Sequence, residues 1–185
     1  MDHGTERTSN TLESLYVNIF MPSILFVCTA NRFRSPLAAL YFAREVVRHD
    51  DDKDFQVSSA GVWTSDGVPA TEDVIEFAEQ YALNLNFHKS RVVTEEILSA
   101  ADLILVMEAG QKEAIAQEFP SIKNRILLLT EAVGYPPYDI PDPYKSKEPY
   151  NHIGKEIIQM IDSGYDQIIQ LAWNKVHQTE PESKK

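Results

Sequence analysis

The sequence predicts one α/β domain in which a four-stranded parallel sheet carries helices on both faces. Three stretches, 23–27, 103–107 and 126–129, are continuous apolar runs of strand length, as expected for strands that are buried on both sides. A fourth stretch, 55–59, is also predicted to be a strand and is ended by Gly61. Helical segments separate these strands, and such alternation favours a parallel sheet. The 185 residues fit a single domain, with no internal repeat and no dividing linker.

The predicted helices are 35–49, 71–83, 110–118 and 148–173. The first has apolar residues at helical spacing and Pro36 in its first turn, where proline is tolerated. The second begins with Thr71 as a cap and has acidic residues in its first turn. The last carries one long apolar stripe, and Gly164 is expected to be its weak point.

Charge and cysteine content limit the class of protein. The net charge of −11 argues against general binding to nucleic acid or to anionic membranes. The single cysteine cannot form an internal disulfide, which favours a reducing compartment. No run has the length of a membrane span, and the acidic residues near the start do not resemble a secretory signal. We therefore expect a cytoplasmic protein.

The domain is expected to occupy residues 23–175. Residues 1–22 are predicted to be a poorly ordered extension, and residues 176–185 a polar tail. Met21 directly precedes the first strand and is an alternative start.

The stretch from Val27 to Pro36 predicts a phosphate-binding loop. It begins where a buried strand ends and stops where a helix begins, so its N–H groups and those of the helix N-terminus can surround an anion. Such a position stabilises a thiolate at Cys28, and Arg34 can donate two parallel hydrogen bonds to phosphate. The hydroxyl of Ser35 can donate to the thiolate or to the departing sulfur. The loop residues between the cysteine and the arginine are Thr29, Ala30, Asn31, Arg32 and Phe33.

A buried structural cysteine at the end of a core strand is the simpler alternative, because free cysteines are often buried. Cysteine and arginine at this spacing are weak indicators when they stand alone. Here they coincide with strand, loop, Ser-Pro and helix in the required order, which favours a nucleophile at Cys28.

These residues resemble the low-molecular-weight protein tyrosine phosphatase family. The match is Cys-x5-Arg-Ser-Pro near the start of the domain and Asp142-Pro143-Tyr144 late in the chain, with Ser59-Ala60-Gly61, the stretch 88–91 and the stretch 102–107 as further marks. The resemblance covers roughly residues 23–173. It implies a flavodoxin-like sheet, chemistry without metal or cofactor, a phosphocysteine intermediate and phosphotyrosine-containing proteins as partners. A bacterial tyrosine kinase is a reasonable partner by family analogy.

The loop departs from the family pattern at three positions. The family usually has glycine where this chain has Ala30, and often a second cysteine where it has Phe33. Arg32 occupies a position that is often Ile or Thr, and members with Thr include phosphoarginine phosphatases. Arg32 fits neither pattern, so a preference for phosphotyrosine or phosphoarginine stays open.

A proline-braced loop, 138–144, offers the general acid that a phenolate leaving group needs. The resemblance assigns this role to Asp142, with Asp139 as the lesser candidate, and Tyr144 as an aromatic wall of the substrate pocket. Pro-Asp-Pro is also good turn chemistry, and both interpretations can hold together.

Supporting roles are implied for three further residues by the resemblance. Asn31, Ser59 and His88 match a hydrogen-bond network that braces the loop, although a surface position is as common for a histidine. Trp63 is a candidate for the pocket wall, and packing in a loop is at least as good an explanation for it. No His/Cys cluster has the spacing of metal ligands.

Three other functions remain as alternatives to phosphotyrosine hydrolysis. A thiol-dependent arsenate reductase would need further cysteines, which the chain lacks. A phosphocarrier should avoid assisted hydrolysis. Arg34 and Asp142 would assist hydrolysis, so both residues argue against a carrier. A catalytically silent phosphate-binding module is suggested by Ala30 and Arg32.

Overall fold

A computed structural model describes residues 21–49 and 55–179 of the chain. The expectations for residues 1–20 and 180–185 lie outside the described residues. Along the described chain no helix is both long and apolar enough to cross a membrane.

The sheet has four parallel strands, as predicted, and their order is β2-β1-β3-β4. The strands are β1 (Ser23–Cys28), β2 (Gln56–Gly61), β3 (Leu103–Val106) and β4 (Ile126–Leu128). β1 and β3 are the central strands. β1 is buried from Ile24 onward and β3 is buried throughout, which explains why both have an unbroken apolar sequence. The carboxyl ends of β1, β2 and β3 therefore meet at one edge, where ligands bind in open parallel sheets.

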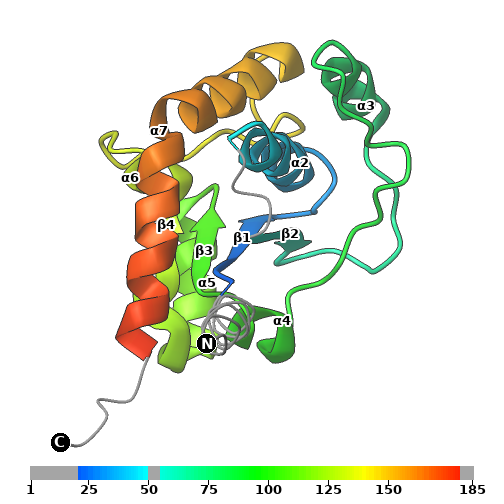
Figure 1. Ribbon diagram of the computed structural model, residues 1–185. Coiled ribbons are helices and arrows are strands. Elements are labelled where there is room, and N and C mark those ends of the chain that lie inside the picture. The colour runs from blue at the N-terminus through cyan, green and yellow to red at the C-terminus, as the bar shows by residue number, and fades with distance from the viewer. Residues whose placement is uncertain (1–20, 50–54, 180–185) are drawn as a thin grey trace, which may run out of the picture.

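Helices cover both faces of this sheet (Figure 1). The helices are α2 (Arg34–Arg48), α3 (Glu72–Glu79), α4 (Glu95–Ser99), α5 (Ala109–Glu118), α6 (Leu129–Ala132) and α7 (Tyr150–Thr179), with a 3₁₀ turn at Pro120–Arg125. Ile24 and Phe26 of β1 pack into a core with α2, α3 and α7, whereas Leu25 and Val27 pack with α4 and α5. The alternation along β1 thus produces two apolar layers.

Two glycines allow α7 to approach its neighbours closely. A Cβ at Gly154 would lie 2.6 Å from the ring of Phe77, and one at Gly164 would lie 2.3 Å from Val133. α7 continues through Gly164, where a side chain has no room, and the expectation that this glycine is the weak point of the helix stays a prediction. The helix also includes residues 176–179, the first part of the predicted polar tail.

The helix predicted at 71–83 is shorter than expected. It ends at Glu79, and the chain then turns, with Ala82 at a φ of 56°. Thr71 occupies the N-cap position, but its side chain makes no capping hydrogen bond. The short helices α4 and α6 and the 3₁₀ turn were not predicted, because segments of this length carry little periodicity.

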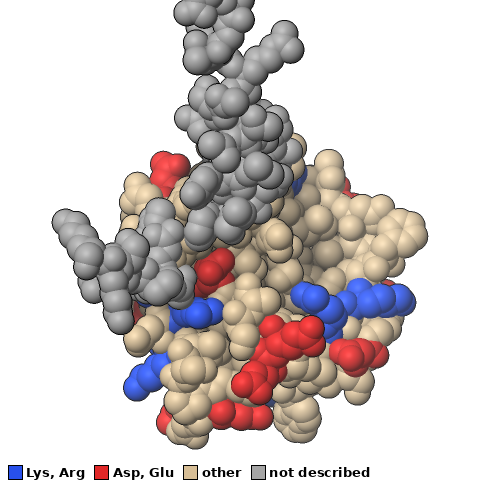
Figure 2. Space-filling model, turned by 60° about the horizontal axis from the view of Figure 1, so that its bottom comes forward, with Lys and Arg blue, Asp and Glu red and all other residues tan. Residues whose placement is uncertain are grey.

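Charges of both signs are mixed on the face shown in Figure 2. Lysine and arginine side chains there lie among aspartates and glutamates, and neither sign forms a broad patch. This face offers no extended basic surface of the kind that nucleic acids require.

Candidate active site

The loop between β1 and α2 turns tightly around the sulfur of Cys28. The backbone N–H of Asn31 donates to Cys28 Sγ at 3.3 Å, and Ser35 Oγ lies 3.1 Å from the same sulfur. Asn31 has a φ of 53°, a left-handed conformation that asparagine tolerates better than most residues. Ala30 does not have a positive φ, which explains why alanine can replace the usual glycine of such loops.

Asn31 ties this loop to the surrounding structure through every polar atom of its side chain. Its Nδ2 donates to Ser35 Oγ and to Ser59 Oγ, both at 2.9 Å, and its Oδ1 accepts from the backbone N–H of Arg91 at 2.9 Å. The residue is completely buried. A fully satisfied buried network of this kind holds a loop in one conformation.

His88 adds a further brace to the backbone of the loop. Its Nε2 lies 2.7 Å from the carbonyl oxygen of Asn31, so this nitrogen carries the proton and donates. Burial lowers the pKa of His88, and the charge of Arg91 lowers it further, although the bond to Asn31 acts in the opposite direction. His88 and Ser59 therefore both lie where the resemblance placed them, against Asn31.

Gly61 lets the loop lie directly on β2. It pairs with Cys28 across the sheet, and a Cβ here would lie 2.8 Å from Thr29 O and 2.9 Å from Asn31 N. Both contacts are with backbone atoms, which cannot rotate away. In the sequence, Gly61 indicates only the end of a strand and one mark of the resemblance. Its contact with the loop becomes apparent only from the pairing of the strands.

Arg34 is buried and held by four groups, three of which come from distant parts of the sequence. Its Nη1 donates to a carboxylate oxygen of Glu108 and to the carbonyl of Ile140 at 2.9 Å. Its Nη2 donates to Asp142 Oδ2 at 2.9 Å and to Thr29 Oγ1 at 3.3 Å. The side chain is only 2% exposed, so its charge is compensated chiefly by the two carboxylates.

Asp142 stands at the pocket, and Asp139 has a different role. Asp142 Oδ1 accepts from the backbone N–H of Tyr144 at 3.0 Å, which is the turn chemistry expected of this segment. Asp139 Oδ1 instead accepts from the backbone N–H of Ala109, at the start of α5, at 2.7 Å. With the bond from Ile140 N to Met107 O, at 2.8 Å, this fixes the acid-bearing loop to the end of β3.

Glu108 and Gln111 were not identified from the sequence. Gln111 Nε2 donates to Thr29 Oγ1 at 3.1 Å and to Glu108 Oε1 at 3.0 Å, and its Oε1 accepts from the backbone N–H of Met107 at 3.0 Å. Gln111 thus connects the end of β3 with both the loop and the carboxylate that holds Arg34. The only local signal is the Glu-x-x-Gln spacing at the start of a helix, which is typical of a cap.

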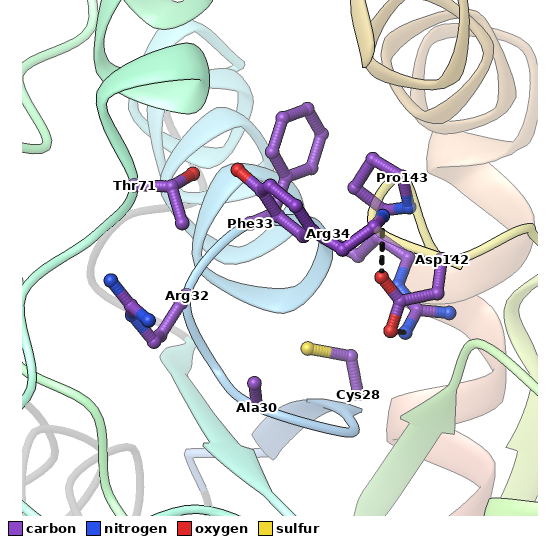
Figure 3. A pocket seen from close by; sticks show the side chains of 9 residues that line it. Cys28, Ala30, Arg32, Phe33, Arg34, Thr71, Asp142 and Pro143 are labelled. Carbon is purple, nitrogen blue, oxygen red and sulfur yellow. Dashed lines mark hydrogen bonds and ion pairs between the residues drawn. The ribbon is translucent and has the colours of Figure 1, made fainter. Parts of the chain in front are cut away.

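The pocket has a volume of about 130 Å³ and is lined by Cys28, Ala30, Arg32, Phe33, Arg34, Thr71, Asp142, Pro143 and Tyr144. Figure 3 shows Cys28 and Ala30 at its base, Arg32 and Thr71 on one side, and Asp142 with Pro143 on the opposite side. A phosphate at the sulfur would therefore lie between the loop and the Asp142 carboxylate.

Tyr144 contacts α3 across the pocket. Its hydroxyl donates to Asp73 Oδ2 at 2.8 Å. Burial raises the pKa of Tyr144 and Asp73 raises it further, while the Thr71 hydroxyl and the charge of Arg32 act in the opposite direction. Trp63 does not line this pocket: its side chain is 80% exposed, although its backbone N–H donates to Thr29 O at 2.9 Å. A role for Trp63 in substrate binding stays a prediction.

Within residues 21–49 and 55–179, no group of three or more His, Cys, Asp or Glu side chains is arranged to hold a metal ion. What the pocket does hold is a cysteine at its base, hydrogen-bond donors around it, a buried arginine and a carboxylate on its side wall. This combination, on the carboxyl edge of a parallel sheet, defines the class of cysteine-dependent phosphatases.

Comparison with known proteins identifies the family within this class. Residues 23–179 match the model of the low molecular weight phosphotyrosine protein phosphatase, so the chain belongs to that family. It is 36% identical to the protein-arginine-phosphatase of Bacillus subtilis (strain 168) over 65% of this chain and 79% of that protein. It is 30% identical to the probable low molecular weight protein-tyrosine-phosphatase EpsP of Ralstonia nicotianae, over 78% and 91% respectively. The crystal structure of the low molecular weight protein tyrosine phosphatase from T. tengcongensis superimposes with a TM-score of 0.72, at 31% identity, over 79% of this chain and 99% of that chain.

Proposed function

We propose that the protein hydrolyses phosphotyrosine in other proteins through a phosphocysteine intermediate on Cys28. The observation that carries this proposal is that one pocket has the Cys28 sulfur at its base and the Asp142 carboxylate on its side wall, with Arg34 bonded to Asp142. A nucleophile and an acid so placed can act on the two ends of a reacting phosphoryl group.

In the first step, the thiolate of Cys28 attacks phosphorus, the S–P bond forms and the P–O bond to the tyrosyl oxygen breaks. Asp142 gives its proton to that oxygen, so tyrosine leaves as a neutral phenol. Arg34 Nη2 exchanges Asp142 for a phosphate oxygen, and the loop N–H groups bind the others.

In the second step, water attacks the phosphocysteine. The Asp142 carboxylate accepts a proton from that water, a new P–O bond forms and the S–P bond breaks. Ser35 Oγ, at 3.1 Å from the sulfur, stabilises the departing thiolate by hydrogen bonding. Inorganic phosphate leaves, and both Cys28 and Asp142 return to their starting states.

Phosphoarginine is the second candidate substrate, because one relative is named a protein-arginine-phosphatase. Arg32 argues against it in this chain. A phosphoarginine side chain keeps a cationic guanidinium next to its phosphoryl group, and that cation would enter a pocket whose wall already carries the charge of Arg32. A phosphotyrosine ring is neutral and is suited to a wall that includes Phe33 and Tyr144.

The proposed setting is the cytoplasm, since a single catalytic thiol needs a reducing compartment. The proposed partners are proteins that carry phosphotyrosine, with a bacterial tyrosine kinase as one candidate by family analogy.

A peptide panel tests this function. Phosphotyrosine, phosphoserine and phosphoarginine peptides of matched sequence are compared by kcat/KM, with Cys28→Ser as the control. We expect phosphotyrosine to be hydrolysed most efficiently and Cys28→Ser to be inactive on all three. Preference for the phosphoarginine peptide would establish the second candidate, and no turnover of any substrate would establish a silent binding module.

A further inference from the structure

We propose that Arg32 forms a subsite that binds a carboxylate side chain next to the phosphotyrosine of the substrate. The proposal rests on the proposed function and extends it, because it names the kind of phosphotyrosine sequence that the pocket prefers. It concerns the side of the pocket occupied by Arg32 and Thr71 in Figure 3.

The Arg32 side chain is fixed by the segment before α3. Its Nε donates to the carbonyl of Pro69 at 2.8 Å, and its own carbonyl accepts from the backbone N–H of Thr71 at 3.1 Å. These two bonds attach the loop to this segment and hold the guanidinium at the pocket wall. Less side-chain entropy is therefore lost when a substrate binds there.

The charge of Arg32 is not compensated as that of Arg34 is. Arg34 is paired with two carboxylates, whereas no ion pair links Arg32 to any acid in the described part of the chain. Among the described residues only Nε of Arg32 has a hydrogen-bond partner, so Nη1 and Nη2 can donate to a bidentate acceptor. A carboxylate is the planar acceptor that such a pair of donors fits.

The geometry of the pocket brings the neighbours of phosphotyrosine to Arg32. The phosphate must reach Cys28 at the base, and the ring lies between the walls, so the substrate backbone crosses the mouth. Lys89 is exposed and forms a backbone β-bridge with Pro69, whose carbonyl accepts from Arg32, so the backbone of a second basic residue lies near this side. In a chain of net charge −11, local cations of this kind are needed to accept an acidic peptide.

The acids that begin α3 lie on the same side of the pocket as Arg32, because Thr71, whose backbone N–H donates to Arg32, directly precedes them. Glu72 is exposed, and Asp73 binds the Tyr144 hydroxyl at 2.8 Å, so this part of the mouth is anionic. An acidic substrate residue is therefore favoured only where its carboxylate reaches Nη1 and Nη2 of Arg32, and it is disfavoured beyond them along α3. The preference should appear at one of the two positions that flank phosphotyrosine.

The test uses phosphotyrosine peptides that carry Glu or the isosteric Gln at one flanking position. The readout is the ratio of kcat/KM for the Glu peptide to that for the Gln peptide, measured in each variant. We expect the wild-type ratio at one flank to be about fivefold at low salt, and to shrink at an ionic strength of about 0.5 M. Arg32→Gln should bring the ratio close to one, and Arg32→Glu should invert it.

A matched control is Arg48→Gln, which makes the same change of charge at the far end of α2. Arg48 is 65% exposed and pairs with Glu45, and the length of the helix places it about 20 Å from the loop. The ratio in Arg48→Gln should equal the wild-type ratio. Because each ratio compares two substrates in one variant, a general loss of activity or stability cancels.

The outcomes separate this proposal from the proposed function. Hydrolysis of both peptides with a wild-type ratio of one at both flanks would overturn the subsite and leave the phosphatase intact. A ratio unchanged in Arg32→Gln, with equal losses on both peptides and on nitrophenyl phosphate, would show that Arg32 binds the phosphate itself and would also overturn it. Failure to hydrolyse any phosphotyrosine peptide would instead overturn the proposed function.

Discussion

Gly61→Ala perturbs the phosphate loop from the neighbouring strand without altering any reacting group. The added Cβ would lie 2.8 Å from Thr29 O, whereas ordinary van der Waals contact begins at 3.4 Å. The strand or the loop must therefore move by about 0.6 Å, the difference of these two distances. Both neighbouring atoms belong to the backbone, so no rotamer change can relieve the contact.

The expected cost follows from this displacement. Overpacking of a tight site costs about 1–3 kcal/mol, and in a domain of this size each kcal/mol lowers Tm by about 2–4 °C. A misplacement of about 1 Å at a reacting centre can reduce the rate about 10²-fold. We therefore expect kcat/KM for an aryl phosphate to fall at least about tenfold in Gly61→Ala, with a lower Tm.

Gly110→Ala is the matched control for this variant. It makes the same chemical change within α5, where no described atom outside the helix's own backbone and the two chain neighbours lies within 4 Å of the new Cβ. Alanine is also favoured over glycine in a helix by about 1 kcal/mol, so Tm should stay equal or rise and activity should be kept. Wild-type kcat/KM and Tm in Gly61→Ala would refute the claim that the strand holds the loop in place.

Three further predictions concern the groups around the loop. Asp142→Asn should slow phosphotyrosine hydrolysis by about 10²–10⁴-fold. It should slow nitrophenyl phosphate hydrolysis less, because nitrophenolate leaves readily without being protonated. Equal losses on both substrates would show that Asp142 only shapes the loop. Glu108→Gln should make inorganic phosphate a tighter competitive inhibitor by about threefold, since one negative charge near Arg34 is removed; weaker inhibition would show that Glu108 acts mainly by positioning Arg34. The lowered pKa of His88 favours its neutral form in the folded state, so its contribution to stability is present above pH 6.5 and is lost as the pH falls through the folded pKa. The Tm of His88→Gln, which keeps a donor for the loop carbonyl, should depend less on pH below 6.5 than that of the wild type, and parallel curves would contradict this.

The elements that could be predicted are those whose signal is local. The central strands could be predicted because both of their faces are buried. Residues such as Ile24 and Leu105 therefore belong to unbroken apolar runs in the sequence. The phosphate loop is visible because strand, cysteine, arginine and helix follow one another within a few residues. The placement of helices on both faces of the sheet could be predicted because strands and helices alternate along the chain.

The parts that could not be predicted depend on contacts between distant segments. Glu108 and Arg34 are separated by 74 positions, and nothing around Glu108 distinguishes it from an ordinary helix cap. The Asp-Pro-Tyr motif singles out Asp142, but only the structure shows that Asp139 binds the start of α5. The identity of such partners is set by tertiary packing, which local patterns do not encode.

The most direct test of the proposed mechanism is to trap the phosphoryl group on the enzyme. Wild-type protein is mixed with excess phosphotyrosine peptide, quenched within one turnover, digested and analysed by mass spectrometry, with Cys28→Ala treated in parallel. We expect the mass of one phosphoryl group on the fragment that contains Cys28, formed before inorganic phosphate appears, and no turnover in Cys28→Ala. Steady hydrolysis by Cys28→Ala, or a phosphoryl group on any other residue of the wild type, would contradict a nucleophilic role for Cys28.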